Sequence, residues 1–240
     1  MYLMLGTRPD LAYAIGKLAR FSSNPSQDHW DALRRVLTYL KNFPDIRLEL
    51  VKGASIAPEG YVDADYANDK SNRKSTAGYV FSVSGTAFSW SSKKEPTVAT
   101  STMEAEYIAL FFGSQQAAWI EQFYKQIGFE LQNPIRIHCD SETAIAVAKK
   151  EESHKASKHL DVKFHSVRER IANGQINVTF IKSEFNTADV FTKSVPRKTF
   201  AVHTTSMGLV QEQEDYIADE EEEREVDAIL TPPSEDGSQD

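Results

Sequence analysis

The amino-acid sequence predicts an α/β protein in which a mixed five-stranded sheet is flanked by helices and preceded by a helical segment. Three consecutive segments are rich in β-branched and aromatic residues, and Ser84-Gly85 between the last two indicates a hairpin. Two further strand-like segments alternate with helical ones, as in strand–helix units. Gly128 and Asn173-Gly174 follow helical segments at the position where glycine commonly ends a helix. A hairpin group joined to strand–helix units implies one mixed sheet with helices on its faces.

The first 50 residues have the apolar spacing of helices. Apolar residues recur at helical intervals from Leu11 to Ala19, the pattern stops at Asn24-Pro25, and it resumes from Trp30 to Leu40. Two amphipathic helices of this size do not form a convincing domain alone. We therefore expect that they pack on something else, or once did.

The remaining elements follow in the order of three strands, a long helix, a strand, two helices, a strand and a final helix. The strands are predicted at 61–65, 76–83, 86–92, 135–139 and 176–181, and the helices at 102–127, 144–149, 160–171 and from Thr187 onward.

The composition is typical of a globular protein that does not span a membrane. The 240 residues are 40% hydrophobic, which is enough for one or two domains with a core of their own. A single cysteine, Cys139, excludes an intramolecular disulfide framework, so we expect a reducing intracellular compartment, the cytoplasm or the nucleus. No apolar run approaches the ~20 residues that span a bilayer, and we expect no membrane partner.

Charge is concentrated at the C-terminus. Residues 211–240 carry 13 acidic side chains and 1 arginine, so they contribute −12 to a net charge of −8 and leave +4 on the remainder. This stretch has too little apolar content to offset its ordering entropy, and we predict that it is disordered. The mildly basic body remains compatible with a nucleic-acid partner, and the tail is a candidate either to dock on a basic partner or to mask that basic surface.

Acidic residues at the ends of otherwise apolar elements are the candidate chemical groups. Asp63 lies within the first strand of the sheet and shares a face with Asp65. Asp140 directly follows an apolar strand, and Asp189 lies near the start of the last helix. Helix capping and the helix dipole offer simpler explanations for the last two, and a solvated edge strand offers one for Asp63.

Glu104 and Glu106 both belong to the long helix. Residues two apart point to different sides, so at most one of the two faces any given site. The periodicity does not choose between them.

Considered together, several stretches resemble one family: the C-terminal part of copia-type retrotransposon Pol polyproteins, from the end of the reverse transcriptase through the ribonuclease H domain. The resemblance covers the chain from Met1 to about Leu209, and its stretches occur in the order of the family. They are Thr7-Arg8-Pro9-Asp10, Asp63-Ala64-Asp65, Arg73-Lys74-Ser75-Thr76-Ala77-Gly78-Tyr79, Ser89-Trp90-Ser91-Ser92-Lys93-Lys94, Glu104-Ala105-Glu106-Tyr107-Ile108-Ala109, Cys139-Asp140-Ser141, Lys158-His159-Leu160-Asp161 and Ala188-Asp189-Val190-Phe191-Thr192-Lys193.

The resemblance implies a ribonuclease H-like fold, with three antiparallel strands followed by parallel strands. It divides the chain into a helical remnant of the reverse transcriptase at 1–57, a ribonuclease H-like domain at 58–210 and an acidic tail at 211–240. It also implies the catalytic and metal-binding quartet of Asp63, Glu106, Asp140 and Asp189, and so favours Asp63 over Asp65 and Glu106 over Glu104.

The implied activity is hydrolysis of the RNA strand of RNA/DNA hybrids. Two Mg²⁺ ions about 3.5–4 Å apart generate the attacking water and stabilise the leaving oxygen, and Mn²⁺ is able to replace them. Clustered carboxylates suit Mg²⁺ because it prefers oxygen ligands, and without a cation their mutual repulsion raises their pKa values. Cleavage of this kind leaves a 3′-hydroxyl and a 5′-phosphate.

Basic residues are candidates to contact the hybrid, which the enzyme distinguishes by its 2′-hydroxyls and groove shape. The first group is Arg73, Lys74, Lys93 and Lys94, and the second is Lys155, Lys158, Lys163, Arg168 and Arg170. Ordinary solvated surface is the competing explanation for each. A further expected partner is the rest of a reverse transcriptase polyprotein.

Two departures from the family leave alternatives open. Many ribonucleases H carry a histidine in the loop before the last acid, whereas 182–187 contain none, which predicts slow turnover unless Glu184 substitutes. The polymerase palm with its adjacent aspartates is also absent, so polymerase activity is not expected. The alternatives are a catalytically inactive hybrid-binding or structural relic of the retroelement, and an integrase- or transposase-like nuclease, which the acid order disfavours.

The histidines suggest zinc only superficially. His138, His154, His159 and His165 fit no helix pattern in which two histidines lie one turn apart, and packing or hydrogen bonding explains them better.

Overall fold

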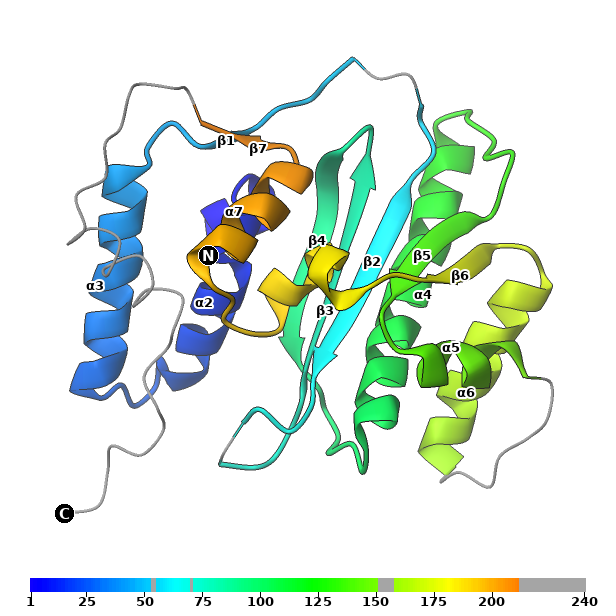
Figure 1. Ribbon diagram of the computed structural model, residues 1–240, viewed down its shortest axis with the longest axis horizontal. Coiled ribbons are helices and arrows are strands. Elements are labelled where there is room, and N and C mark those ends of the chain that lie inside the picture. Colours follow the sequence, from blue (N-terminus) through cyan, green and yellow to red (C-terminus); the bar gives the residue numbers. More distant parts are fainter. Residues whose placement is uncertain (53–54, 70, 151–157, 212–240) are drawn as a thin grey trace.

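A computed structural model describes residues 1–52, 55–69, 71–150 and 158–211, with side chains described from 162 onward in the last range (Figure 1). The predicted disorder of the acidic tail therefore lies outside the described residues, as do Lys155 and the side chain of Lys158. Among the described helices, none combines the length and the apolar character needed to cross a membrane.

The centre of the protein is a five-stranded mixed sheet with the strand order β4-β3-β2-β5-β6. Strands β2, β3 and β4 pair antiparallel, and β5 and β6 run parallel to β2. Their bounds are Glu59–Asp65 for β2, Thr76–Val83 for β3, Thr86–Lys94 for β4, Ile135–Cys139 for β5 and Ile176–Phe180 for β6. This arrangement confirms the predicted ribonuclease H-like fold class.

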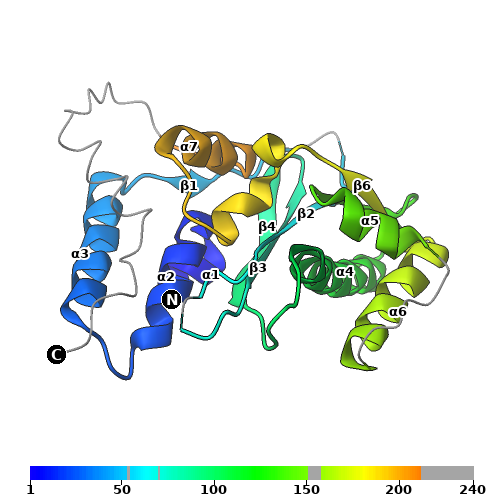
Figure 2. The same ribbon diagram turned by 60° about the horizontal axis from the view of Figure 1, so that its bottom comes forward.

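Three helices cover one face of the sheet: α4 (Thr102–Gln126), α5 (Glu142–Lys149) and α6 (Lys158–Ala172) (Figure 2). Helix α4 begins at Ser101, whose hydroxyl accepts a hydrogen bond from the Glu104 amide at 3.2 Å. It packs directly on the central strand, since a Cβ on Gly113 would lie 2.5 Å from Cγ1 of Val62. The helix ends before Gly128, whose φ of +83° is the left-handed conformation that glycine adopts without strain.

The opposite face carries the C-terminal elements and the N-terminal helices. The C-terminal elements are the short 3₁₀ helices η3 (Ser183–Phe185) and η4 (Thr187–Phe191) and helix α7 (Arg197–Ser206). The N-terminal ones are α1 (Tyr2–Gly6), η1 (Pro9–Leu11), α2 (Ala12–Leu18), η2 (Ala19–Phe21) and α3 (Gln27–Asn42). Leu11, Val36, Val80, Phe191 and Phe200 belong to one buried cluster, so the N-terminal helices and the sheet share a core.

The N-terminal segment is also fixed internally by a buried ion pair. A guanidinium nitrogen of Arg8 lies 2.8 Å from Oδ2 of Asp10, with side-chain exposures of 5% and 0%. The Tyr39 hydroxyl of α3 donates to the same oxygen at 2.9 Å. These bonds join η1 to α3.

Two differences from the predicted elements concern short structures. Residues 1–50 were predicted to be helical, but β1 (Arg47–Leu48) pairs antiparallel with β7 (Leu209–Val210). Two-residue strands carry no periodicity from which they could be predicted. The predicted last helix is divided into η4 and α7, and Pro196 precedes the first residue of α7.

Candidate active site

Three aspartates from separate elements meet at the end of the central strands. One carboxylate oxygen from each of Asp63, Asp140 and Asp189 lies within 4.8 Å of the other two. The parallel register pairs Val62 of β2 with Cys139 of β5, so the next residues, Asp63 and Asp140, emerge side by side. The pairing of β2 with β5 therefore explains why two of the four predicted acids, Asp63 and Asp140, lie together.

Asp189 reaches the same place because η4 is anchored to β2. The side-chain amide of Asn186, which is fully buried, donates to the carbonyl of Val62 at 3.0 Å. Its oxygen accepts from the Ala188 amide at 3.2 Å and so begins the 3₁₀ turn that contains Asp189.

Glu106 approaches from the helix on the other face. A carboxylate oxygen of Glu106, the sulfur of Cys139 and an oxygen of Asp140 form a second group within 4.8 Å. Asp140 belongs to both groups, so the four predicted acids form one continuous cluster. Glu106 is 6% exposed, and a backbone hydrogen bond from Ala64 stabilises its ionised form.

Neighbouring side chains orient the carboxylates. The Thr192 hydroxyl and the Lys193 ammonium both contact Oδ2 of Asp63, the ammonium at 3.7 Å. The same ammonium lies 3.1 Å from Oδ2 of Asp189. Asp140, which is only partly buried, accepts a hydrogen bond from the Ser183 hydroxyl of η3.

Burial and mutual repulsion raise the pKa values in this cluster. Desolvation, with the charges of Asp63 and Asp140, raises the pKa of Glu106 to about 10. Desolvation and the charge of Asp63 raise the pKa of Asp189 to about 7, although Lys193 opposes this shift. The pKa of Asp63 is also raised, chiefly by burial. Without a cation, the site at neutral pH therefore holds protons that ordinary carboxyl groups would have lost.

The donor set fits a divalent cation that prefers oxygen. Among the described residues, Glu106 Oε2 and Asp189 Oδ1 are buried acceptors with no hydrogen-bond partner. An unpaired buried acceptor is costly, and a bound cation would satisfy it. Burial raises the pKa of Cys139 far above its usual range, so its thiol stays protonated and is a poor ligand. Carboxylate oxygens alone are the donors expected for Mg²⁺ or Mn²⁺.

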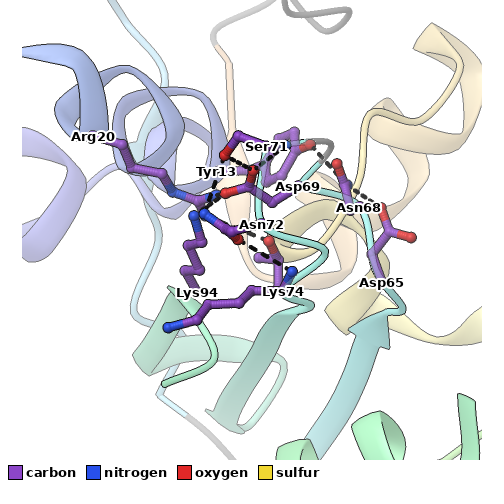
Figure 3. A network of polar contacts seen from close by, with 10 residues as sticks. Tyr13, Arg20, Asp65, Asn68, Asp69, Ser71, Asn72, Lys74 and Lys94 are labelled. Atoms are coloured by element: carbon purple, nitrogen blue, oxygen red, sulfur yellow. Dashed lines mark hydrogen bonds and ion pairs between the residues drawn. The ribbon is translucent and has the colours of Figure 1, made fainter. Parts of the chain in front are cut away.

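Asp65 and Glu104, the alternatives to Asp63 and Glu106, have different surroundings. The Asn68 side-chain amide donates to Asp65, which belongs to the polar network of the β2–β3 loop (Figure 3). Glu104 accepts hydrogen bonds from the amide of Thr100, at 2.9 Å, and from its hydroxyl. It therefore stabilises the start of α4. Neither acid belongs to the carboxylate cluster.

The first basic group contains two exposed side chains and two that bind to other groups of the protein. Arg73 and Lys93 are exposed. The Lys74 ammonium donates to the Pro96 carbonyl at 2.6 Å, and Lys94 forms an ion pair with Asp69 (Figure 3). Lys74 and Lys94 thus fasten the β2–β3 loop to the end of β4.

The described members of the second group also make local contacts. The Arg168 guanidinium donates to the Val147 carbonyl at 3.1 and 3.2 Å, and Arg170 donates to the Ser166 carbonyl at 3.2 Å. Lys163 is partly buried.

Four residues of the site were not singled out from the sequence: Ser183, Asn186, Thr192 and Lys193. A signal existed for Lys193, because it lies four residues after Asp189 and is the last residue of the family-like stretch 188–193. Glu184, considered as a substitute for the absent loop histidine, is 65% exposed at its side chain and lies 3.8 Å from the Lys182 ammonium. The η3 residue that contacts the cluster is Ser183.

Among the four histidines considered for zinc, His165 is exposed, and His154 and the side chain of His159 lie outside the described residues. His138 stacks on Tyr61 with ring centroids 4.7 Å apart, and its Nδ1 bonds to the Thr179 hydroxyl at 3.1 Å. Neither group of possible metal-binding side chains in the described part of the chain includes a histidine.

The sheet order and the acid cluster at the ends of β2 and β5 together define a ribonuclease H-like protein. No protein-family profile matches the chain. It is 40% identical over 209 residues, 87% of its length, to the retrovirus-related Pol polyprotein from transposon TNT 1-94 of Nicotiana tabacum. It is 34% identical over 205 residues to that from transposon RE2 of Arabidopsis thaliana.

The matched region is 16% of the first polyprotein and 14% of the second, so the chain corresponds to a small part of each. A shorter match, 48% identical over 120 residues, covers 50% of this chain and 84% of the secreted RxLR effector protein 161 of Plasmopara viticola. Because the polyprotein matches extend over 85–87% of the chain, it belongs with the Pol polyproteins of plant copia-like transposons.

Among solved structures, a ribonuclease H1 isolated from compost matches 57% of this chain and 94% of its own. Its sequence identity is 21% and the TM-score is 0.42. The strand order, rather than this distant likeness, identifies the fold.

Proposed function

We propose that the chain is the ribonuclease H part of a retrotransposon Pol polyprotein and hydrolyses the RNA strand of RNA/DNA hybrids with two divalent cations. The observation that carries this proposal is the convergence of four acids from four separate parts of the chain in one largely buried cluster. Capping or surface solvation does not require such a convergence, whereas metal-assisted hydrolysis does.

Asp63, Glu106, Asp140 and Asp189 would hold the cations, with Asp140 shared between the two groups of ligands. When bound, two divalent cations supply a nucleophilic water at neutral pH and stabilise the leaving oxygen. Thr192 and Ser183 fix the orientation of Asp63 and Asp140 through their hydroxyl groups. Burial of Asp63 and Asp189 strengthens each of these electrostatic contacts.

The exposed Arg73 and Lys93 are our candidates for contacts with the hybrid backbone. The engaged Lys74 and Lys94 are weaker candidates, because a phosphate would compete with their present partners. We further propose that 1–57 are the end of the reverse transcriptase, that 58–210 are the nuclease domain and that the rest of the polyprotein is a partner. The expected location is a reducing compartment, the cytoplasm or the nucleus.

A cleavage assay tests the proposal. The full chain is incubated with an end-labelled RNA/DNA hybrid while Mg²⁺ is titrated, beside double-stranded RNA and double-stranded DNA. We expect metal-dependent cleavage of the hybrid RNA alone, to 5′-phosphate products. The variant Asp140→Asn should lose this activity, whereas Asp65→Asn, which lies outside the carboxylate cluster, should retain it.

Residues 182–187 contain no histidine, which favours one alternative, a relic that binds hybrids without cleaving them. Hybrid binding with no cleavage at any Mg²⁺ or Mn²⁺ concentration would support the relic. Strand transfer on duplex DNA would support the integrase-like alternative instead.

A further inference from the structure

Lys193 brings a positive charge into the acid cluster. It is four residues after Asp189, and its ammonium lies 3.1 Å from Oδ2 of Asp189 and 3.7 Å from Oδ2 of Asp63. Among the ion pairs of the described residues, it provides the only cation paired with any of the four acids.

Its position leaves other oxygens of the cluster available. The ammonium contacts Oδ2 of both aspartates, whereas Asp189 Oδ1 and Glu106 Oε2 are buried without a partner. The Lys193 side chain is 38% exposed, compared with 2% for Asp63. A long side chain at that exposure can withdraw toward solvent, which the carboxylates cannot do.

We propose that Lys193 is a positioning residue that acts as an internal counter-cation. It holds Asp63 and Asp189 together when no metal ion is bound, and it withdraws when a divalent cation enters. The inference rests on the proposed metal-dependent function. It adds that Lys193 competes with the metal ion for the carboxylates of Asp63 and Asp189.

Two consequences follow from electrostatics. Without metal, removal of the ammonium leaves the acids with no opposing charge, so the fold should lose stability. With metal, the same removal eliminates the repulsion between the ammonium and the entering ion, so metal affinity should rise. A merely structural ion pair predicts the first effect without the second.

The experiment uses the full chain and Mn²⁺ alone as the probe. The variants are Lys193→Met, which removes the charge at similar length, and Lys193→Arg, which retains it. Lys198→Met is the matched control, because Lys198 is an exposed lysine at the start of α7 and its loss changes the net charge equally. Thermal unfolding is measured in EDTA and in saturating Mn²⁺, and the Mn²⁺ dissociation constant is measured by calorimetry.

In EDTA, Lys193→Met should unfold about 4 °C below the wild type, and Mn²⁺ should close this gap. Its Mn²⁺ affinity should be about tenfold higher than that of the wild type. Lys193→Arg and Lys198→Met should stay within about threefold of the wild type, because each leaves a positive charge beside the aspartates.

Unchanged or weaker Mn²⁺ binding by Lys193→Met, in a wild type that does bind Mn²⁺, would overturn this inference and leave the proposed function intact. Failure of Lys193→Met to fold even with Mn²⁺ would also overturn it, because the ion would then not replace the ammonium. A wild type that binds no Mn²⁺ would refute the proposed function, and this inference with it.

Discussion

Glu104 and Glu106 are two residues apart on one helix, yet their carboxylates have different neighbours. Glu104 accepts hydrogen bonds from Thr100 at the start of α4, whereas Glu106 lies beside Asp140 with one oxygen unpaired. The first carboxylate stabilises a helix end, and the second carries an electrostatic cost that a cation would remove.

Exchange of each glutamate for glutamine separates these roles. Glu104→Gln should lower the free energy of unfolding by about 1 kcal/mol and retain metal-dependent hybrid cleavage, because only a helix-end interaction is weakened. Glu106→Gln should reduce cleavage at least about 100-fold and leave the metal-free protein no less stable, because a buried acid is replaced by a neutral amide. Denaturant unfolding in EDTA and the hybrid assay measure the two effects. The reverse assignment, with activity lost in Glu104→Gln alone, would contradict the site.

The raised pKa of Asp189 predicts a pH dependence of stability. An acid with a raised folded-state pKa destabilises the fold progressively as pH rises from its unfolded value, 3.8, to its folded value, about 7. In EDTA, the melting temperature of the wild type should therefore fall relative to that of Asp189→Asn between about pH 4 and about pH 7. Melting curves at intervals of one pH unit provide the measurement. A difference that is constant or grows in favour of the wild type would show that the Asp189 pKa is not raised.

The sequence could name these acids only through family resemblance. Strand alternation places Asp63 and Asp65 on one face, and helix periodicity leaves Glu104 and Glu106 equivalent. The two members of each pair differ in their contacts in the folded protein, which depend on the register of β2 with β5 and on the hydrogen bonds at the start of α4. Ser183 and Thr192 could not be predicted from spacing, because their contacts depend on how η3 and η4 return to the sheet.

At the scale of elements, the site depends on how closely η4 approaches the sheet. Gly78 of β3 lies directly opposite Asp63 of β2. A Cβ at this position would lie 2.7 Å from Cβ of Phe191 and 2.8 Å from Cγ2 of Thr192. The small residue therefore permits the contact that brings Asp189 to Asp63.

Gly78→Ala should displace η4 and with it Asp189. We expect a loss of about 2 kcal/mol in the free energy of unfolding, as for overpacked cores, and weaker Mn²⁺ binding. Gly16→Ala in helix α2 is the control, because its Cβ would make only an ordinary contact of 3.5 Å with the backbone oxygen of Ser92. Chemical denaturation and Mn²⁺ titration of both variants test this. Wild-type metal affinity in Gly78→Ala would show that the approach of η4 does not determine the site.

The elements themselves were largely predictable. The five strands of the sheet and the long helix have strong alternation, turn or cap signals, so their predicted and observed ranges differ by only a few residues. The pair β1–β7 and the 3₁₀ form of η4 were missed, because very short elements are determined by the contacts that they make with distant parts of the chain.

For the whole molecule, the N-terminal helices form part of the core. Leu11 and Val36 pack in one cluster with Val80 and Phe191, and Asp10 of the buried Arg8–Asp10 pair accepts a hydrogen bond from Tyr39 of α3. The proposed boundary near residue 57 therefore separates the reverse-transcriptase and nuclease segments of the polyprotein, but the two segments share one hydrophobic core.

Asp10→Asn tests how much this packing contributes. Loss of one partner from a buried ion pair leaves an uncompensated guanidinium, so the free energy of unfolding should fall by about 3–5 kcal/mol. Asp31→Asn removes one partner of an exposed pair with Arg34, at 48% and 69% side-chain exposure, and should change stability by less than about 1 kcal/mol. Equal effects in the two variants, measured by denaturant unfolding, would argue that the N-terminal helices are not integral to the fold.

The acidic tail predicts a salt-dependent effect on binding. If residues 211–240 mask a basic surface, their deletion in an Asp140→Asn background should tighten hybrid binding severalfold at about 20 mM salt and much less at about 300 mM, where charges are screened. Fluorescence anisotropy with a labelled hybrid measures the affinity. The same affinity with and without the tail at low salt would exclude masking.

The central claim is that acids distant in the sequence converge to bind a pair of divalent cations. Anomalous diffraction from crystals of the full chain grown with MnCl₂ tests it most directly. We expect two manganese peaks at ligand distance from the carboxylates of Asp63, Glu106, Asp140 and Asp189, both lost in Asp140→Asn. Manganese bound elsewhere on the protein, or no manganese at this cluster in an otherwise intact fold, would contradict the claim.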